Sequence, residues 1–247
     1  MSITKSGVKQ NNMKIYNPER RLRRFAGDVI ASQNRDIIKL ITGDSILEVG
    51  SGYGTLINQI KNEKPNISRI TGIDNDITYI KMAKKLYNID ILSYSAYQMN
   101  FPNDSFDTVI LRDSIHHLAE NNKLQDAMHE IKRVCKKELI VFDPNPTRLV
   151  RLCRRFINHE DNEAALDFVL KTLEDNNFKA ISCQWRDVIA HPLGGGFVSL
   201  ELIPNIKFIK KWILTCDRFL NRVLAKLKLQ HYFCWRYLIY AKKNDGQ

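Results

Sequence analysis

The stretch that most constrains the fold is residues 46–54, Ile-Leu-Glu-Val-Gly-Ser-Gly-Tyr-Gly. Its first part is short and mostly apolar, which predicts a buried strand over about 45–49. The glycines that follow let the backbone take positive φ and approach a ligand closely. Apolar residues then recur at helical spacing over 55–63. A strand, a glycine turn and a helix in this order hold a nucleotide-like ligand at the edge of an open parallel sheet.

A second apolar run, over residues 69–74, ends in an acid and supports this interpretation. Asp74 follows the glycines by about 20 residues, the spacing of an acid that binds ribose hydroxyls. The two runs with the helix between them predict a βαβ unit, whose ligand lies at the carboxyl ends of the strands.

The spacing of the glycines also bears on the kind of cofactor. A dinucleotide site needs a small residue three places after the second glycine. That place holds Thr55, and the third glycine comes early, at Gly54. The run from Glu48 to Gly54 instead resembles the acid-x-Gly-x-Gly-x-Gly motif of class I S-adenosylmethionine-dependent methyltransferases. The resemblance implies S-adenosylmethionine as the cofactor and methyl transfer as the reaction.

The later motifs extend the resemblance to about residue 143. After the third predicted strand the family has an acid and a small residue, and then an apolar-Pro-Phe run before Ser-Phe-Asp. Residues 95–107 fit this frame, but Ser95 stands where the family has Asp. A serine hydroxyl accepts a hydrogen bond without charge, so we expect a weaker contact to the adenine amino group.

By this resemblance Glu48 fixes the glycine turn or meets the methionine amino group, and the first glycines line the methionine moiety. Asp74 takes the ribose hydroxyls, and Ser95 and Ala96 flank the adenine. No metal is expected. The cofactor-binding set that we predict is Glu48, Gly50, Ser51, Gly52, Asp74, Asn75, Ser95, Ala96 and Arg112.

The predicted fold class is α/β, with a three-layer Rossmann-like sheet of seven strands that is mostly parallel and whose last strand is antiparallel. We expect a mobile basic tail at 1–15 and one methyltransferase domain at 16–247. Its core covers 40–185 and 234–243, with a helical lid inserted at 186–232. The chain should begin with one helix from about 16 to 41, and the strands are predicted at 45–49, 69–74, 89–94, 106–111, 138–142, 178–185 and 235–241.

Candidate catalytic residues follow the fourth predicted strand, where the chain leaves its carboxyl end. If the acceptor is a hydroxyl, a base must remove its proton, and histidine titrates near neutrality. His116 and His117 are both candidates for this base, and either could instead be a structural residue. Asp113 is one helical turn before His116 and could orient it.

The formal net charge of +11 predicts attraction to nucleic acid, an anionic membrane or an acidic substrate, unless it is only a solvated surface. An RNA methyltransferase is one alternative. However, amino-methylating families carry Asn/Asp-Pro-Pro-aromatic after strand four, where this chain has Arg112-Asp113-Ser114-Ile115, and the Pro-Cys of the base-carbon family is also absent. We therefore expect a small-molecule or lipid-linked acceptor and no nucleic acid. A non-catalytic cofactor-binding regulator is the other alternative.

The inserted segment contains a basic amphipathic stretch at 207–228. It predicts either a lid packed on the sheet edge or an interfacial helix that contacts anionic lipid. No apolar run approaches the roughly 18–20 residues that span a bilayer. The polar N-terminus lacks an apolar signal core, which favours a cytoplasmic protein, and an interfacial helix at 207–228 would make it membrane-associated. The five cysteines form no CxxC pair, and we expect them to be buried free thiols.

Overall fold

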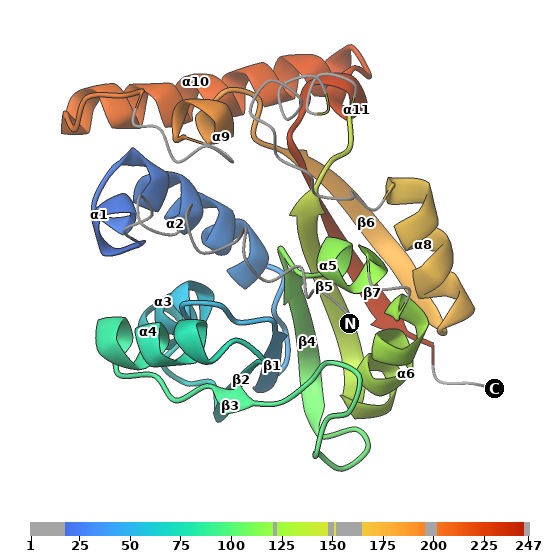
Figure 1. The fold of residues 1–247 in the computed structure, drawn as a ribbon. Helices are drawn as coiled ribbons and strands as arrows, with labels where there is room; N and C mark the ends of the chain where they lie inside the picture. Colours follow the sequence, from blue (N-terminus) through green and yellow to red (C-terminus); the bar gives the residue numbers. More distant parts are fainter. Residues whose placement is uncertain (1–17, 121–122, 148–150, 152–164, 196–201, 245–247) are drawn as a thin grey trace, which may run out of the picture.

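A computed structural model describes residues 18–120, 123–147, 151, 165–195 and 202–244. The predicted tail at 1–15 lies outside these residues. At the centre is a seven-stranded sheet of order β3-β2-β1-β4-β5-β7-β6 (Figure 1). Strand β7 is antiparallel to both of its neighbours and the other pairings are parallel, as the sequence predicts. The strands are β1 Ser45–Val49, β2 Arg69–Asp74, β3 Leu92–Ser93, β4 Phe106–Arg112, β5 Cys135–Pro144, β6 Phe178–Arg186 and β7 Arg236–Lys243.

Helices cover both faces of the sheet, which gives the predicted three layers (Figure 1). Adjacent residues of one strand point to opposite faces. Leu47 of β1 packs in the cluster on the side of α6 and α8, whereas Ile46 packs in the cluster on the side of α2 and α3. The helices are α1 Pro18–Leu22, α2 Phe25–Ile38, α3 Thr55–Glu63, α4 Ile77–Tyr87, α5 Ile115–Glu120, α6 Leu124–Val134, α8 Leu166–Asp175, α9 Ala190–Leu193, α10 Lys207–Lys226 and α11 Gln230–Phe233.

The N-terminal helical segment differs from the single helix predicted by its periodicity. Arg24 is extended, and it separates α1 from α2. The break places Arg20 and Arg21 in the last turn of α1, and Asp28 in the first turn of α2. Cations are favoured at helix C-termini and acids at N-termini. The break thus relieves the unfavourable basic first turn that one continuous helix would have.

The third strand is also shorter than predicted. Only Leu92 and Ser93 pair with β2, and the backbone N–H of Tyr94 then donates to the carbonyl of Leu92, which ends the strand. The apolar residues that suggested a longer strand, Ile89 and Ile91, are buried in a cluster with α3 and α4. Their burial therefore reflects packing of the loop before the strand, not strand pairing.

The predicted insertion between the sixth and seventh strands contains α9, α10 and α11. Helix α10 lies on the side of the sheet to which the carboxyl ends of β4 and β5 point, next to α9 and α2 (Figure 1). Among the described helices, none combines the length and the apolar character needed to cross a bilayer.

Cys135 and Cys234 are buried free thiols as expected, but Cys183 on β6 is exposed because its strand is at the sheet edge.

Candidate active site

The glycine turn after β1 is tied to the neighbouring strand. The backbone N–H groups of Gly50 and Ser51 both donate to the carbonyl of Ile73, at 2.9 and 3.0 Å. Gly52 has a φ of +52°, which favours glycine, and a Cβ added there would find no atom within 4 Å. The turn is therefore fixed to β2 by these hydrogen bonds. At Gly52 it leaves open space, which a bound cofactor needs.

Asp74 ends β2 and supports the same turn. One carboxylate oxygen accepts from the N–H of Gly52 at 2.8 Å, and the other accepts from the N–H of Asp76 at 2.9 Å. A carboxylate has about four acceptor sites. Asp74 can thus hold the turn and still accept from the two hydroxyls of a ribose. Asn75, predicted beside it, is exposed.

Ser95 and Ala96 follow β3 and are half-buried. The hydroxyl of Ser95 accepts from the backbone N–H of Tyr97 at 3.2 Å, and this bond closes a tight turn. The hydroxyl retains its own proton as a donor and a second lone pair. Ser95 comes shortly after β3, the edge strand next to β2, and its contact with the adenine stays a prediction.

The carboxyl ends of β1 and β4 bring together a buried group of charges. Glu48 is 2% exposed, and burial raises the pKa of its carboxyl to about 8, with Arg112 acting in the opposite direction. Arg112 donates to Thr55 and to Gln33 of α2, each at 3.2 Å. Burial lowers the pKa of its guanidinium. Arg112 therefore spans from β4 to both α2 and α3, and shapes the wall between the cofactor turn and α2.

Asp113 lies close to two arginines. Its carboxylate pairs with Arg236, the first residue of β7, and lies 3.9 Å from Arg112. Burial acts to raise the pKa of Asp113, but these two arginines outweigh it and hold the pKa well below its usual range. The backbone of Asp113 is left-handed (φ 55°) where it leads into α5, and its carboxylate engages Arg236. That Asp113 orients His116 stays a prediction.

Asp143 contacts His116. The Nδ1 atom of His116 lies 3.0 and 3.1 Å from the two carboxylate oxygens of Asp143, at the end of β5. Both side chains are buried, and Asp143 is fully so. Burial raises the pKa of Asp143, and His116 opposes this rise. The ring of the exposed His117 lies 4.1 Å from that of His116, between centroids.

Sequence reasoning missed Asp143 and Arg236 as site residues, although a signal for each was present. Asp143 lies at the carboxyl end of β5, which pairs with β4, so its side chain reaches the same end of the sheet as His116. Arg236 begins an antiparallel strand, and the amino end of such a strand lies at this same edge. Strand order in space was needed to bring either residue to the site.

Several buried polar atoms along this edge have no hydrogen-bonding partner among the described residues. Glu48 Oε2 and Ser114 Oγ flank the glycine turn, and Arg236 Nε lies farther along. Buried polar groups are nearly always hydrogen-bonded, so unsatisfied ones need a reason such as a ligand. A cationic amine fits Glu48, because it would compensate the burial of that carboxylate. The residues present therefore fit the methionine end of S-adenosylmethionine.

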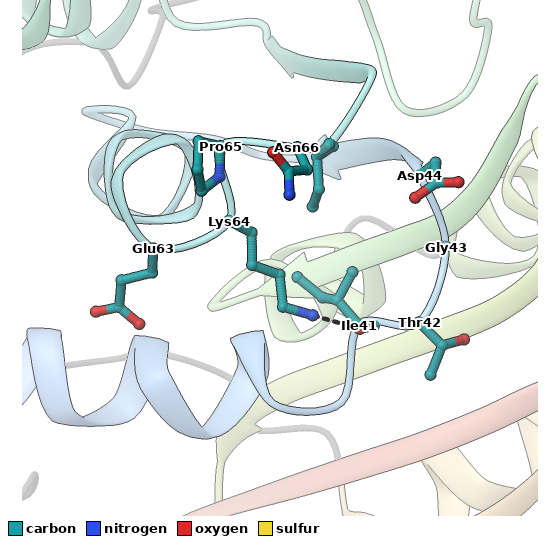
Figure 2. A pocket seen from close by; sticks show the side chains of 9 residues that line it. Ile41, Thr42, Gly43, Asp44, Glu63, Lys64, Pro65 and Asn66 are labelled. Carbon is teal, nitrogen blue, oxygen red and sulfur yellow. Dashed lines mark hydrogen bonds between the residues drawn. The ribbon is translucent and has the colours of Figure 1, made fainter.

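A hollow lies at the opposite end of the strands, where β1 and β2 begin (Figure 2). It has a volume of about 320 Å³ and is lined by residues 41–44, before β1, and 63–67, after α3. Lys64 Nζ donates to the carbonyl of Ile41 at 2.6 Å within it. Ligands of open parallel sheets bind at the carboxyl ends of the strands. This hollow is at the amino ends, so we do not assign it to the reaction.

Comparison with known proteins relates residues 46–138 and the overall fold to methyltransferases. A family model described as "Methyltransferase domain" matches residues 46–138. The fold is similar to that of a SAM-dependent methyltransferase from Archaeoglobus fulgidus, with 18% identity, a TM-score of 0.63, and coverage of 87% of this chain and 94% of that one. A methyltransferase domain model thus matches residues 46–138, and the chain has the fold of SAM-dependent methyltransferases.

Two other similar structures carry named activities. One is magnesium protoporphyrin IX methyltransferase from Synechocystis with bound SAH, at 12% identity, a TM-score of 0.55, and coverage of 87% and 83%. The other is geranyl diphosphate methyltransferase in complex with SAM, at 11% identity, a TM-score of 0.57, and coverage of 87% and 85%. At these identities the likeness concerns the fold. A search of curated protein sequences finds no match.

Proposed function

We propose that this protein transfers the methyl group of S-adenosylmethionine to an oxygen, nitrogen or carbon of a small or lipid-linked metabolite, with His116 as the general base where a proton must leave. The observation that carries the proposal is the buried His116–Asp143 pair on the same strand edge as the glycine turn and Glu48. Histidine is the side chain most often used as a base near neutral pH.

Cofactor binding uses the turn and the two acids that flank it. Glu48 supplies a buried negative charge for the methionine ammonium. Gly52 leaves room for the rest of the methionine moiety of the cofactor. Asp74 accepts from the ribose hydroxyls while it holds the turn. Ser51, Asn75, Ser95, Ala96 and Arg112 complete the proposed set of contacts. When bound, the cofactor supplies an electrophilic methyl group on a sulfonium.

The proton of an acceptor hydroxyl passes to His116. Asp143 accepts from Nδ1–H of the ring, which sets the tautomer in which Nε2 is the proton acceptor. The glycine turn, Glu48 and Asp74 would hold the cofactor, whose sulfonium would supply the methyl group for the acceptor oxygen and retain the electron pair of the carbon–sulfur bond. His116 takes the hydroxyl proton, and Asp143 stabilises the resulting imidazolium. The remaining work of the site is alignment of the acceptor.

The choice of His116 follows from burial, and the choice of acceptor follows from a similar structure and from charge. His116 is preferred to His117 as the base because its ring is buried and held by a carboxylate, whereas His117 is exposed. A lipid-linked acceptor is included because the similar geranyl diphosphate methyltransferase acts on an isoprenoid with an anionic head, and this chain is strongly basic. For the same reason we propose peripheral contact with an anionic membrane through residues 207–228.

Calorimetry with S-adenosylmethionine and S-adenosylhomocysteine tests the proposal. We expect binding in the micromolar range, and Asp74→Ala should weaken it by about tenfold or more because a hydroxyl contact and the support of the turn are lost. Asp76→Ala is the matched control, since Asp76 caps α4 two residues away and is exposed. No binding at millimolar cofactor, or equal loss in both variants, would contradict the proposal.

The role of His116 is tested on the loaded enzyme with a radiolabelled methyl donor and a panel of alcohols, phenols and polyprenyl lipids. His116→Ala should bind the cofactor normally and lose methyl transfer to a hydroxyl by about 100-fold or more. His117→Ala should retain it. Normal turnover in His116→Ala would remove that residue as the base, and binding without turnover on any acceptor would favour a cofactor-binding regulator.

A further inference from the structure

Helix α10 is fixed to the body of the protein by one face. The carboxylate of Asp217 accepts from the backbone N–H groups of three successive residues, 188–190, at 2.9, 2.7 and 2.8 Å. Asp217 is 6% exposed, and Ile213 one turn earlier is 5% exposed, in a cluster with Phe25 and Val29 of α2. These contacts set the rotation of α10 about its own axis, and so decide which residues face outward.

The opposite face of α10 carries exposed aromatic side chains. Phe208 is 75% exposed, Trp212 59% and Phe219 63%. Intervals of four and seven residues place all three on one face. Asp217 comes nine positions after Phe208, which is about two and a half helical turns. This aromatic stripe is therefore on the face of α10 opposite the buried Asp217. Single exposed apolar residues are ordinary, but three large ones in line form a patch that calls for a partner.

Cations flank this aromatic stripe, and exposed acids are absent from α10. The one acidic residue between positions 202 and 233 is Asp217, which is buried. Lys210 pairs with Asp28 of α2 at 2.6 Å and so belongs to the inner face. The remaining basic side chains of the segment are exposed, and they are Lys207, Lys211, Arg218, Arg222, Lys226 and Lys228.

We propose that this outer face of α10 docks on an anionic lipid bilayer, with Phe208, Trp212 and Phe219 entering the interface and the flanking cations meeting the headgroups. Aromatic rings favour the headgroup level of a bilayer, and basic side chains are attracted to anionic lipid. The inference rests on the proposed function only in that a lipid-linked acceptor would then be reached from the membrane. Docking itself needs neither cofactor nor acceptor.

A lipid surface fits these observations better than a second copy of the chain. Two copies meeting through the aromatic stripe would bring their cationic rows together, and like charges in an interface are unfavourable. A helix of this length with a fixed apolar stripe and a basic flank matches an interfacial helix that lies in the plane of the membrane. Because α10 is on the side of the carboxyl ends of β4 and β5, docking turns the candidate site toward the bilayer (Figure 1).

Tryptophan fluorescence reports directly on the proposed contact. The full-length protein is titrated with vesicles of phosphatidylcholine alone, or mixed with phosphatidylglycerol, that contain brominated acyl chains. Trp212 is exposed, whereas Trp185 on β6 is half-buried and Trp235 is buried, so quenching by the bromines on the mixed vesicles should come mainly from Trp212. Trp212→Phe should still bind but lose most of the quenching. Quenching that is unchanged in Trp212→Phe would overturn the proposed orientation.

Vesicle flotation separates the apolar and the electrostatic contributions. Reversal of three cations, in Lys211→Glu/Arg222→Glu/Lys226→Glu, should lower partitioning into the mixed vesicles by at least about 100-fold, since each cation contributes roughly fivefold. Phe208→Ser/Trp212→Ser/Phe219→Ser should lower it by about tenfold or more. Phe168→Ser/Ile181→Ser is the control, because it removes exposed apolar side chains from α8 and β6 instead; it should float like the wild type.

Several results would overturn the proposal. These are flotation that is equal in all four proteins, equal binding to neutral and mixed vesicles, or a dimer in solution that only the aromatic variant disrupts. Tight, salt-dependent binding of tRNA without vesicle binding would assign the face to nucleic acid instead. Calorimetry with S-adenosylmethionine, done on the same variants without vesicles, keeps this outcome separate from failure of the proposed function.

Discussion

Two buried glutamates on the same sheet have opposite environments. Glu48 near the end of β1 and Glu138 in β5 are each 2% exposed. Glu138 accepts from the N–H and hydroxyl of Thr42, the hydroxyl of Thr108 and the hydroxyl of Tyr240, at 2.6 to 2.9 Å. Glu48 Oε2 has no such partner among the described residues.

The pKa values differ accordingly. Burial acts to raise both, but the hydrogen bonds from Thr108, Thr42 and Tyr240 outweigh it and lower the pKa of Glu138, whereas the pKa of Glu48 rises to about 8. A carboxylate whose acceptors are filled by the protein stabilises the fold. One that is buried and left unfilled lowers stability when it ionises, and such groups cluster at functional sites. From this difference we interpret Glu138 as a structural residue and Glu48 as a ligand-binding residue.

The largest effect expected from this comparison is on folding. Glu138→Ala should lower the free energy of unfolding by about 3–5 kcal/mol, because it leaves the buried hydroxyl of Thr108 and the backbone N–H of Thr42 without their acceptor. Urea denaturation measures this. A loss below about 1 kcal/mol would mean that water or another group replaces Glu138. The two glutamates would then differ in position but not in their contribution to stability.

The next effect is on cofactor affinity. Glu48→Gln keeps the size of the side chain but removes the charge that would meet the methionine ammonium, and we expect a loss of about 30-fold in affinity for S-adenosylmethionine. Calorimetry measures this, with Glu130→Gln as a control because Glu130 pairs with Arg133 away from the turn. Wild-type affinity in Glu48→Gln would leave its carboxylate with no role in binding.

The sequence predicts the cofactor-binding part of the site better than the contacts of His116. The βαβ unit at 45–74 is readable because local signals repeat there: apolar strands, positive-φ glycines and an acid at fixed spacing. The partner of His116 was not readable. Asp113 is close in sequence, but Asp143 reaches the ring through a neighbouring strand, and sequence spacing carries no information on such contacts. Amphipathicity indicated α10, whereas only packing reveals which apolar residues face outward.

A smaller effect is the pH dependence of binding. With a pKa of about 8, Glu48 is mostly protonated at pH 6 in the free protein and must lose its proton to meet a cationic amine. Affinity should therefore rise by about 25-fold between pH 6 and pH 7.5, with release of close to one proton at pH 7. Calorimetry in buffers of different ionisation enthalpy counts that proton. Glu48→Gln should show neither effect, and a proton release equal to the wild type in that variant would place the titration elsewhere.

The smallest effect is on stability, and it runs opposite to that of Glu138. The pKa of Glu48 is raised in the folded state, from 4.5 to about 8. The contribution of its protonated form to stability is thus complete below pH 4.5 and is lost as the pH rises through 8. Relative to wild type, Glu48→Gln should be more stable at pH 9 by at least about 1 kcal/mol and gain progressively less toward pH 5. Denaturation of both proteins across this range measures the difference. A gain that does not depend on pH would mean that Glu48 is paired when ionised, and the distinction between a carboxylate for the scaffold and one for a ligand would no longer hold.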